Sequence, residues 1–331
     1  MAKRERVIAA IRREGTDRIP HNVFFTSQAL QRMVEYTGNP DYAETIGNHI
    51  HQMKLRKPKL PVPGKYEHLL DEFGVEFDIS GVDKDIGAVA NNIIRDAEEM
   101  AAYTPPEVDE TWLRDACLRH VSTRGDRFTV ALLGFSLFER AWSLCGMENL
   151  LCYMITSPGG VRSLFAKLTE YDLKKVKIAV DCGFDGIMFG DDWGQQRGLI
   201  MGPPIWRELI KPCFTEMYAY IKSRGRFVFH HSCGDCRKIT GDLAEMGLDV
   251  YQTFQPEIYG LNKLPGLTIW GGISTQVDLP FRSPNEIYDL TKRTMSVLGE
   301  GGGYIAAPTH DLPGDVPPEN IEAMVRAFIE N

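Results

Sequence analysis

The stretch Phe227-Val-Phe-His-His-Ser-Cys-Gly-Asp-Cys236 is an apolar run of strand length that ends in a polar turn containing glycine. Alternate residues of a strand point to the same face, so His231 and Cys233 are expected on one side of the backbone. An imidazole and a thiolate placed in this way can reach one Zn²⁺ ion at about 2.0–2.3 Å. Cysteine and histidine are also common in protein cores, so the spacing alone leaves a metal site and a packing role both open.

Short apolar runs alternate with long amphipathic segments through the second half of the chain. This alternation is typical of strand–helix units in a parallel sheet. The predicted strands are residues 129–133, 186–190, 226–230, 250–254, 268–271 and 304–307. The predicted helices are residues 159–181, 204–224, 236–246, 284–298 and 318–328, several of which open with proline in the first turn.

Two further segments bring the number of predicted strands to eight. Residues 18–25 form the opening strand, and residues 75–79 form a weaker second one. Eight strand–helix units close a (β/α)8 barrel. The sequence therefore predicts an α/β protein, a single TIM-barrel domain over residues 1–331, with an N-terminal helical and loop insertion in which the proline-rich residues 57–65 form a surface loop.

Composition excludes several classes of function. The 331 residues carry a formal net charge of −8, which argues against a nucleic-acid or anionic-membrane partner. No stretch approaches the roughly 20 apolar residues that a bilayer requires, and the first residues lack the apolar core of a signal peptide. Seven cysteines, an odd number, favour reduced thiols over a disulfide framework. We therefore expect a cytoplasmic protein.

Polar side chains follow five successive predicted strands. In a barrel enzyme the carboxyl ends of the strands build the active site. The polar groups run from Asp191 to Gln196, from His231 to Cys233, at Gln255, from Gly272 to Ser274 and from Thr309 to Asp311. Merely solvated loops would hold more lysine and glutamate, so we interpret the cluster as a functional site.

Several motifs resemble the uroporphyrinogen decarboxylase superfamily, and together they span nearly the whole chain. They are Arg4-Glu-Arg-Val-Ile, Asp17-Arg-Ile-Pro20, Phe73-Gly-Val, Asp191-Asp192, Ser232-Cys-Gly, Trp270-Gly-Gly-Ile-Ser-Thr-Gln276, Gly301-Gly-Gly-Tyr-Ile-Ala-Ala-Pro-Thr-His310 and Val316-Pro-Pro-Glu-Asn-Ile321. More narrowly, the chain resembles the methyltransferase branch, whose members work with corrinoid proteins. The resemblance implies a cytoplasmic barrel enzyme with a deep pocket at the carboxyl ends of its strands.

The first strand departs from the decarboxylases of this superfamily. Those enzymes carry an arginine-rich motif there, which grips the carboxylates of a tetrapyrrole, whereas this chain has Ile19-Pro-His-Asn-Val-Phe-Phe-Thr26. A multiply anionic substrate would lack bidentate partners, so the sequence disfavours a tetrapyrrole. Phe24 and Phe25 suit a smaller, flatter substrate, although one of the two is equally compatible with plain barrel core.

Zinc-dependent thiol methyltransferases of the superfamily use a His-x-Cys pair and a later cysteine on the last strand. The resemblance carries the pair over to His231 and Cys233, and this chain offers His310 at the later position. Imidazole in place of thiolate leaves Zn²⁺ more positive and a better Lewis acid. The alternative is that His310 acts without metal as a general acid beside Asp311.

Other polar residues near the predicted mouth receive narrower roles. Of Asp191 and Asp192 only one should face the pocket, and we expect Asp191 to do so as a catalytic group. Trp193 is expected to line the substrate pocket near the mouth. Gln196 and Gln255 are candidate hydrogen-bonding partners of the substrate, although a lone glutamine is more often a loop residue.

Two neighbours of the metal motif are interpreted as structural. His230 precedes the pocket-facing His231 by one residue, so strand alternation predicts that it faces the outer helices. Cys236 opens a helix, where its thiol is expected to pack.

The function we predict is transfer of a methyl group from a small methylated donor, most readily a methoxylated aromatic, to the Co(I) centre of a separate corrinoid protein. Zn²⁺ bound by His231, Cys233 and His310 would assist, with Asp191, His231 and His310 as the catalytic residues. The alternatives are transfer from methylcorrinoid to a thiol, metal-free decarboxylation of a small aromatic acid or tetrapyrrole, and a non-catalytic module that binds a corrinoid or folate. A homodimer is compatible with the sequence, which does not fix the oligomeric state.

Overall fold

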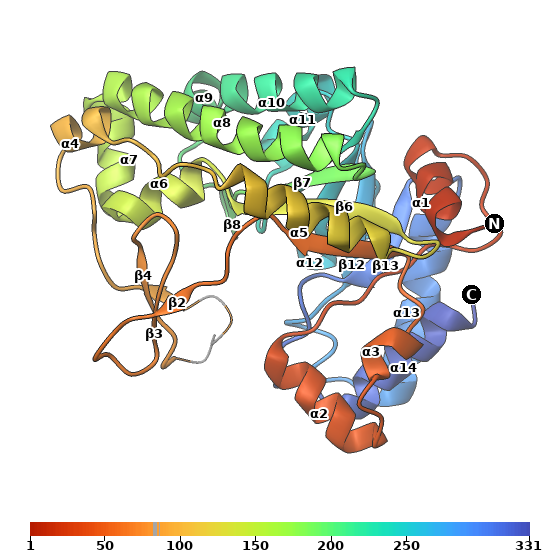
Figure 1. Cartoon of the computed structure of the whole chain (residues 1–331). Coiled ribbons are helices and arrows are strands. Elements are labelled where there is room, and N and C mark those ends of the chain that lie inside the picture. Colours follow the sequence, from red (N-terminus) through yellow and green to blue (C-terminus); the bar gives the residue numbers. More distant parts are fainter. Residues whose placement is uncertain (82–84, 86) are drawn as a thin grey trace.

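The computed structural model describes residues 1–81, 85 and 87–331 and contains a curled sheet of parallel strands (Figure 1). Neighbouring strands follow the order β1-β6-β7-β10-β11-β12-β13. These strands are β1 Ile50–Lys54, β6 Phe128–Phe135, β7 Gly186–Gly190, β10 Phe227–His231, β11 Val250–Phe254, β12 Thr268–Ile273 and β13 Tyr304–Pro308.

The segment 21–25 closes this sheet into a barrel. His21 and Phe25 form isolated parallel bridges with Ala306 and Leu312 on the side of β13. On the other side the backbone amide of His49 donates to the carbonyl of His21 at 3.1 Å. The observed fold is therefore the predicted (β/α)8 barrel, although its opening strand pairs through single bridges rather than a full ladder.

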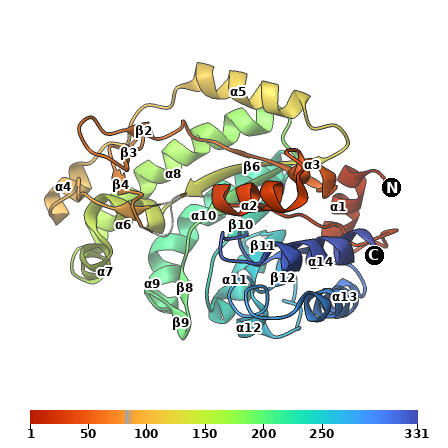
Figure 2. The same ribbon diagram turned by 90° about the horizontal axis from the view of Figure 1, so that it is seen from below.

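Helices surround the strands on the outside of the barrel, as the view from below shows (Figure 2). The α-helices are α1 Lys3–Arg12, α2 Ser27–Thr37, α3 Tyr42–Thr45, α4 Ala97–Ala102, α5 Glu110–Ser122, α6 Phe138–Cys145, α7 Met147–Thr156, α8 Pro158–Asp181, α9 Pro203–Ile205, α10 Lys211–Ser223, α11 Thr240–Glu245, α12 Pro256–Tyr259, α13 Pro284–Gly299 and α14 Pro318–Ile329. A π-helical turn, Trp206–Ile210, joins α9 to α10, and a 3-10 turn, Arg237–Ile239, precedes α11. None of the helices in the described part of the chain is both long and apolar enough to span a membrane.

The predicted elements of the second half are confirmed in type and position. Strands β7 and β11 have the expected bounds, β10 is shifted by one residue from the predicted 226–230, and β6, β12 and β13 extend by one or two residues at an end. The long predicted helix 204–224 is interrupted by the π-helical turn, and the predicted helix 236–246 begins as a 3-10 turn. The strand–helix alternation in the sequence was therefore sufficient to place this half of the barrel.

The second barrel strand was predicted in the wrong place. Residues 75–79 lie in the insertion, where β4 pairs in an antiparallel sheet of order β2-β3-β4-β5, and the barrel strand is β1 instead. The small sheet consists of β2 Leu60–Pro61, β3 His68–Leu70, β4 Glu76–Asp78 and β5 Ala88–Val89. The insertion is thus partly a sheet rather than helix and loop, and it follows the carboxyl end of β1 on the same side of the molecule as α6 and α7 (Figure 1).

The barrel interior and the layer between strands and helices form two separate apolar cores. The interior cluster contains Phe128, Met188, Phe229 and Trp270, together with Val7 of α1. Helix α1 therefore closes the amino end of the barrel, opposite the end at which sites of this fold are built.

Two ion pairs hold the insertion against the barrel. The Arg140 guanidinium of α6 donates to the Asp71 carboxylate at 2.7 Å, and both side chains are less than a tenth exposed. Lys175 of α8 donates to Glu72 at 2.6 Å. Arg140 also lies 3.9 Å from the centre of the Phe73 ring, which adds a cation–π contact.

Buried histidines should make the protein sensitive to acid. Burial lowers the pKa of His21 to about 4 and the pKa values of His49 and His230 to about 3, so the folded state keeps them neutral. The unfolded chain takes up these protons below about pH 6.5, and stability is lost as the pH falls from there toward 3–4. We expect each of the three rings to lower the free energy of unfolding by roughly 1 kcal/mol at pH 5.5 relative to pH 7.5, as measured by urea unfolding. Equal unfolding free energies at the two pH values would contradict this assignment.

Candidate metal site at the barrel mouth

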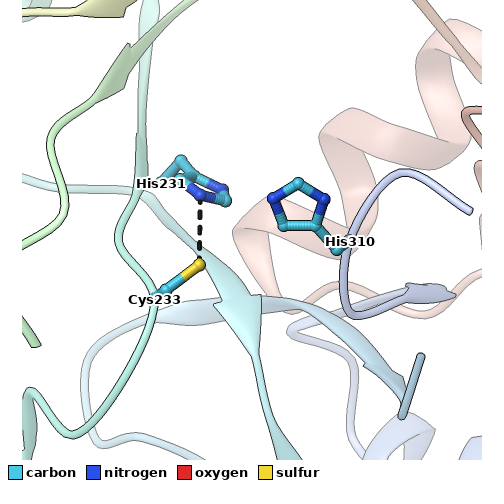
Figure 3. A group of neighbouring side chains, drawn as sticks. All are labelled: His231, Cys233 and His310. Carbon is cyan, nitrogen blue, oxygen red and sulfur yellow. Dashed lines mark hydrogen bonds between the residues drawn. The ribbon is translucent and has the colours of Figure 1, made fainter. Parts of the chain in front are cut away.

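His231, Cys233 and His310 come together at the carboxyl ends of β10 and β13 (Figure 3). Their potential ligand atoms all lie within 4.8 Å of one another, and the Cys233 Sγ atom is 3.4 Å from His231 Nε2. The two imidazole rings meet edge to face, with centroids 5.6 Å apart. Ligand atoms of a tetrahedral zinc site lie roughly 3.5 Å apart, so small rotations of these side chains would suffice to complete one.

The hydrogen bonding of His231 suits a metal ligand. Its Nδ1 atom faces the Oε1 atom of Gln252 on the neighbouring strand β11, and this acceptor assigns the ring proton to Nδ1. Nε2 is then left as a lone-pair donor directed toward Cys233. An outer partner of this kind fixes the orientation of a ligating imidazole. Sequence reasoning missed Gln252, which alternation along β11 places on the inward face, two residues after Val250 of the interior cluster.

The loop that carries Cys233 is held by backbone contacts. The Cys233 amide donates to the Asp192 carboxylate at 2.7 Å, and the Gly234 amide donates to the side-chain oxygen of Gln255 at 2.8 Å. Gln255 therefore positions the metal loop through this bond, and its contact with a substrate stays a prediction. Gly234 has φ +79° and packs directly on the backbone of Gly194.

Substitution of Gly234 should disturb this loop. A Cβ atom there would lie 2.6 Å from the backbone nitrogen of Gln195, and the positive φ disfavours any other residue. We expect Gly234→Ala to lower the free energy of unfolding by roughly 1–3 kcal/mol and to weaken metal binding. Gly241→Ala is the matched control, because a Cβ atom there meets nothing within 4 Å. Equal unfolding midpoints and zinc affinities of the two variants would refute the constraint.

The pair Asp191 and Asp192 is arranged opposite to the prediction. Asp191 is fully buried, and its carboxylate accepts hydrogen bonds from the amides of Phe138 and Glu139 and from the indole of Trp193, at 2.8–3.1 Å. Asp192 instead points into the site, where its Oδ1 atom is 3.5 Å from His231 Nε2. The expectation that Asp191 faces the pocket is therefore wrong: alternation counted from Met188, which lies in the interior cluster, directs Asp192 inward and Asp191 toward the helices.

Glu139 joins the site from the first turn of α6. Burial, followed by the charges of Asp192 and Asp191, raises the pKa of Glu139 well above its ordinary value. Burial, followed by Asp192, likewise raises the pKa of the Cys233 thiol. Glu139 is absent from the sequence prediction, which places the site only at the ends of the later strands. The same rule applied to the end of β6 would have found it.

His310 reaches solvent at the mouth, beside Asp311. Desolvation at the edge of the site, followed by the neighbouring imidazole of His231, lowers the pKa of His310. Its neutral form is therefore favoured, which leaves a ring nitrogen available as a metal ligand and equally suits proton transfer.

Phe24 and Phe25, two of the predicted substrate contacts, point to opposite sides of the first barrel strand. Phe24 faces inward, 6.4 Å from Trp270, and lines a cavity of about 360 Å³ together with Gln52. Phe25 lines the same cavity but also packs against Tyr42 on the helix side, at 6.2 Å. The position of Phe25 fits the alternative that one of the two phenylalanines is barrel core.

Trp193 and Gln196, the other two predicted substrate contacts, lie in different surroundings. Trp193 is fully buried and stacks on His230 at 4.1 Å, so the prediction that it lines the mouth is wrong. Gln196 lies on the exposed turn between the short strands β8 Gly194–Gln195 and β9 Gly198–Leu199. Trp193 is therefore not in place to contact a substrate at the metal ligands, whereas the role of Gln196 stays a prediction.

The residues interpreted as structural behave as expected. His230 is fully buried, and its Nδ1 atom lies 2.7 Å from the hydroxyl of Tyr218 on α10. This contact confirms that His230 faces the outer helices and that the predicted register of β10 is right. Cys236 is also fully buried, and its thiol lies 3.5 Å from the Ser232 hydroxyl.

Comparisons with known proteins agree with this fold. The solved structure of a methyltransferase from Methanosarcina mazei superposes with a TM-score of 0.73 at 18% sequence identity, covering 100% of this chain and 99% of that one. Among curated proteins, the uroporphyrinogen decarboxylase of Coxiella burnetii (strain Dugway 5J108-111) is 24% identical over 360 residues, which is 98% of this chain and 94% of that protein. The enzyme of strain RSA 493 / Nine Mile phase I matches equally well.

A family profile gives the firmest assignment. The profile of uroporphyrinogen decarboxylase (URO-D) matches residues 67–330, which include the strands and loops that carry His231, Cys233 and His310. By this match the chain belongs to the uroporphyrinogen decarboxylase family.

Proposed function

We propose that the protein is a corrinoid-dependent methyltransferase, which moves a methyl group from a methoxylated aromatic compound to the Co(I) centre of a corrinoid protein. The convergence of His231, Cys233 and His310 carries this proposal, because a decarboxylase would not need two imidazoles and a thiol within 4.8 Å. The shared fold of the Methanosarcina mazei methyltransferase is in keeping with it. The first strand adds support, since no arginine between residues 19 and 26 could grip the carboxylates of a tetrapyrrole.

The ligand set fits zinc used as a Lewis acid. His231, Cys233 and His310 would hold the ion, and Asp192 stands close enough to His231 to serve as a fourth ligand or to orient the ring. A bound zinc ion would supply stabilisation of the negative charge that develops on the departing oxygen. One thiolate in place of two leaves the ion more positive, which favours activation of an ether over activation of a thiol.

The protein's own residues position the reaction. Gln252 orients His231, and the amide contact of Asp192 fixes the loop that carries Cys233. With Asp191 committed to the backbone of α6, we assign the catalytic carboxylate role to Asp192 rather than Asp191. The partner corrinoid protein would approach the open mouth, where His310 is exposed, and present its metal in line with the methyl group.

Zinc analysis and a methyl-transfer assay test the proposal together. We expect about one zinc ion per chain in protein purified with zinc, and loss of that zinc in Cys233→Ala and His310→Ala. Cys152→Ala is the matched control, because that thiol is exposed and lies outside the site. Reduced corrinoid should gain a methyl group from a panel of methoxylated aromatics, followed by the change in its visible spectrum.

Several outcomes would contradict the proposal. If protein purified with zinc holds no metal, the metal site is refuted and His310 would instead act as a general acid or base. Decarboxylation of uroporphyrinogen would favour the activity named for the Coxiella burnetii relatives. Methylation of a thiol by methylcorrinoid, without activity on any ether, would mean that transfer runs in the opposite direction.

A further inference from the structure

Every backbone amide of the metal loop, residues 232–236, donates a hydrogen bond to another part of the protein. An unpaired buried amide is costly, so a complete set of acceptors holds a loop in one conformation. All of these acceptors are protein atoms, and the bonds therefore do not depend on a bound ion. In chain order, Ser232 donates to the Gln252 carbonyl at 2.7 Å, Cys233 to the Asp192 carboxylate at 2.7 Å, Gly234 to the Gln255 side chain at 2.8 Å, Asp235 to the Gln195 carbonyl at 2.9 Å and Cys236 to the Tyr259 hydroxyl at 3.2 Å.

Two buried tyrosines support the metal loop from the layer between strands and helices. The hydroxyl of Tyr251 on β11 donates to the carbonyl of Ser232 at 2.9 Å, and the hydroxyl of Tyr259 on α12 donates to the carbonyl of Gly234 at 3.2 Å. Tyr251 is fully buried and Tyr259 is 6% exposed. The residues before and after Cys233 are thus both held by a phenol.

Helix α12 provides two of these contacts from a single turn. Gln255 is its N-cap residue and Tyr259 is its last residue, four positions later, so the two side chains lie on the same side of the turn. The Gln255 side chain accepts from the amide of Gly234, and Tyr259 donates to the carbonyl of the same residue. Pro256 favours the start of a helix at this point. The turn therefore holds Gly234 at both of its peptide groups.

The Tyr259 hydroxyl both donates and accepts. Its proton serves the carbonyl of Gly234, while its oxygen accepts from the amide of Cys236 and lies 3.0 Å from the hydroxyl of Tyr251. Each phenol has one proton, and the shortest bond of Tyr251 commits its proton to Ser232. Removal of the Tyr259 hydroxyl would leave one carbonyl and one amide of the metal loop without partners.

We infer that Tyr259, with Tyr251 beside it, is a positioning residue that fixes the metal loop before the ion binds. The two hydroxyls hold Cys233 where its thiol meets His231 and His310, so binding energy of the ion is not spent on ordering the loop. The inference rests on the proposed function for the identity of the ion, and it adds residues outside the site that determine how tightly the ion is held.

Tyr259→Phe tests the inference by removing a single oxygen atom. The ring, which stacks on Phe254 with centroids 5.3 Å apart, is retained. We expect zinc to bind about ten- to hundredfold more weakly, the range for groups that orient a metal ligand, as measured by competition with a chromophoric chelator. Cobalt(II) bound in place of zinc should give a changed visible spectrum, because its absorption depends on coordination geometry. Tyr251→Phe leaves only the carbonyl of Ser232 unpaired and should have a smaller effect of the same kind.

Tyr304→Phe is the matched control. Its hydroxyl is also buried and also donates to a backbone carbonyl, that of Gly271 at 3.0 Å, but it lies at the start of β13 and does not contact the metal loop. We expect a lowered urea midpoint in both variants, because each loses a buried hydrogen bond. Zinc affinity and the cobalt spectrum should change in Tyr259→Phe and stay unchanged in Tyr304→Phe.

Hydrogen exchange of the zinc-free proteins measures the loop directly. The amides of Gly234 and Cys236 should be protected in the wild type and should exchange at least tenfold faster in Tyr259→Phe. Equal zinc affinities of the wild type and Tyr259→Phe, an equal loss in Tyr304→Phe, or loop amides that gain protection only when zinc is added would overturn the inference. A wild type that binds no zinc would contradict the proposed function, whereas exchange in the zinc-free protein would still decide whether the tyrosines hold the loop. If Tyr259→Phe does not fold, the same measurements on Tyr251→Phe decide the question.

Discussion

Replacement of His231 by alanine is expected to abolish methyl transfer while leaving the barrel folded. The ring is only partly buried at the mouth, and its contacts are to Gln252, Cys233 and Asp192 rather than to the apolar core. Loss of one of three protein ligands should weaken zinc binding by well over tenfold, and the Lewis-acid stabilisation lost with the metal is worth several kcal/mol of barrier. Zinc content, turnover and the urea midpoint of the same preparation measure the three effects.

His230→Ala is the matched control. His230 is fully buried between Trp193 and Tyr218, so its removal should lower the free energy of unfolding by about 1–3 kcal/mol. Zinc content and turnover per folded molecule should change little. Activity lost at His230 and kept at His231 would place the metal on the outer side of β10 and contradict the site.

Removal of the Asp191 carboxylate should cause the largest loss of stability among the substitutions considered. Three donors converge on it, the amides of Phe138 and Glu139 and the indole of Trp193, and the carboxylate is fully buried. Asp191→Ala would leave these donors without an acceptor, at a cost of roughly 3 kcal/mol or more. Urea unfolding followed by circular dichroism gives the difference from the wild type.

The Asp192→Ala variant distinguishes a role of this carboxylate in stability from a role in metal binding and catalysis. Its side chain is about a third exposed and accepts a hydrogen bond from the backbone amide of Cys233, so we expect a stability loss below about 1 kcal/mol. Zinc affinity and turnover should fall instead. Were Asp192→Ala to unfold more readily than Asp191→Ala, the assignment of the two carboxylates would have to be exchanged.

The register of β10 was predictable because a strand has a fixed period. Alternation alone assigned His231 to the interior and His230 to the helices, and both positions are confirmed. Strand β1 was missed because its sequence, Ile-His-Gln-Met-Lys, is too polar to resemble a buried strand. The polarity is explained by Gln52 and Lys54, which point into the barrel.

The same alternation also applies to the residues that directly follow β7. Met188 of β7 belongs to the interior cluster, so alternation continued past Gly190 places Asp192 inward and both Asp191 and Trp193 on the helix side, as observed. Their partners depend on tertiary contacts, with the first turn of α6 for Asp191 and with the helix-side core for Trp193. Glu139 enters the site from α6 for the same reason, through contacts between residues more than 50 positions apart in the sequence.

Helix α6 couples the insertion to the metal site. Arg140 is held by Asp71 of the insertion, while the preceding residue, Glu139, faces the site. A rigid helical turn joins these two side chains, so a change that loosens the Asp71 contact would also move Glu139 relative to Asp192. Substitutions in the insertion near Asp71 are therefore expected to alter the pKa of Glu139 and the catalytic rate, although the substituted residues do not contact the site.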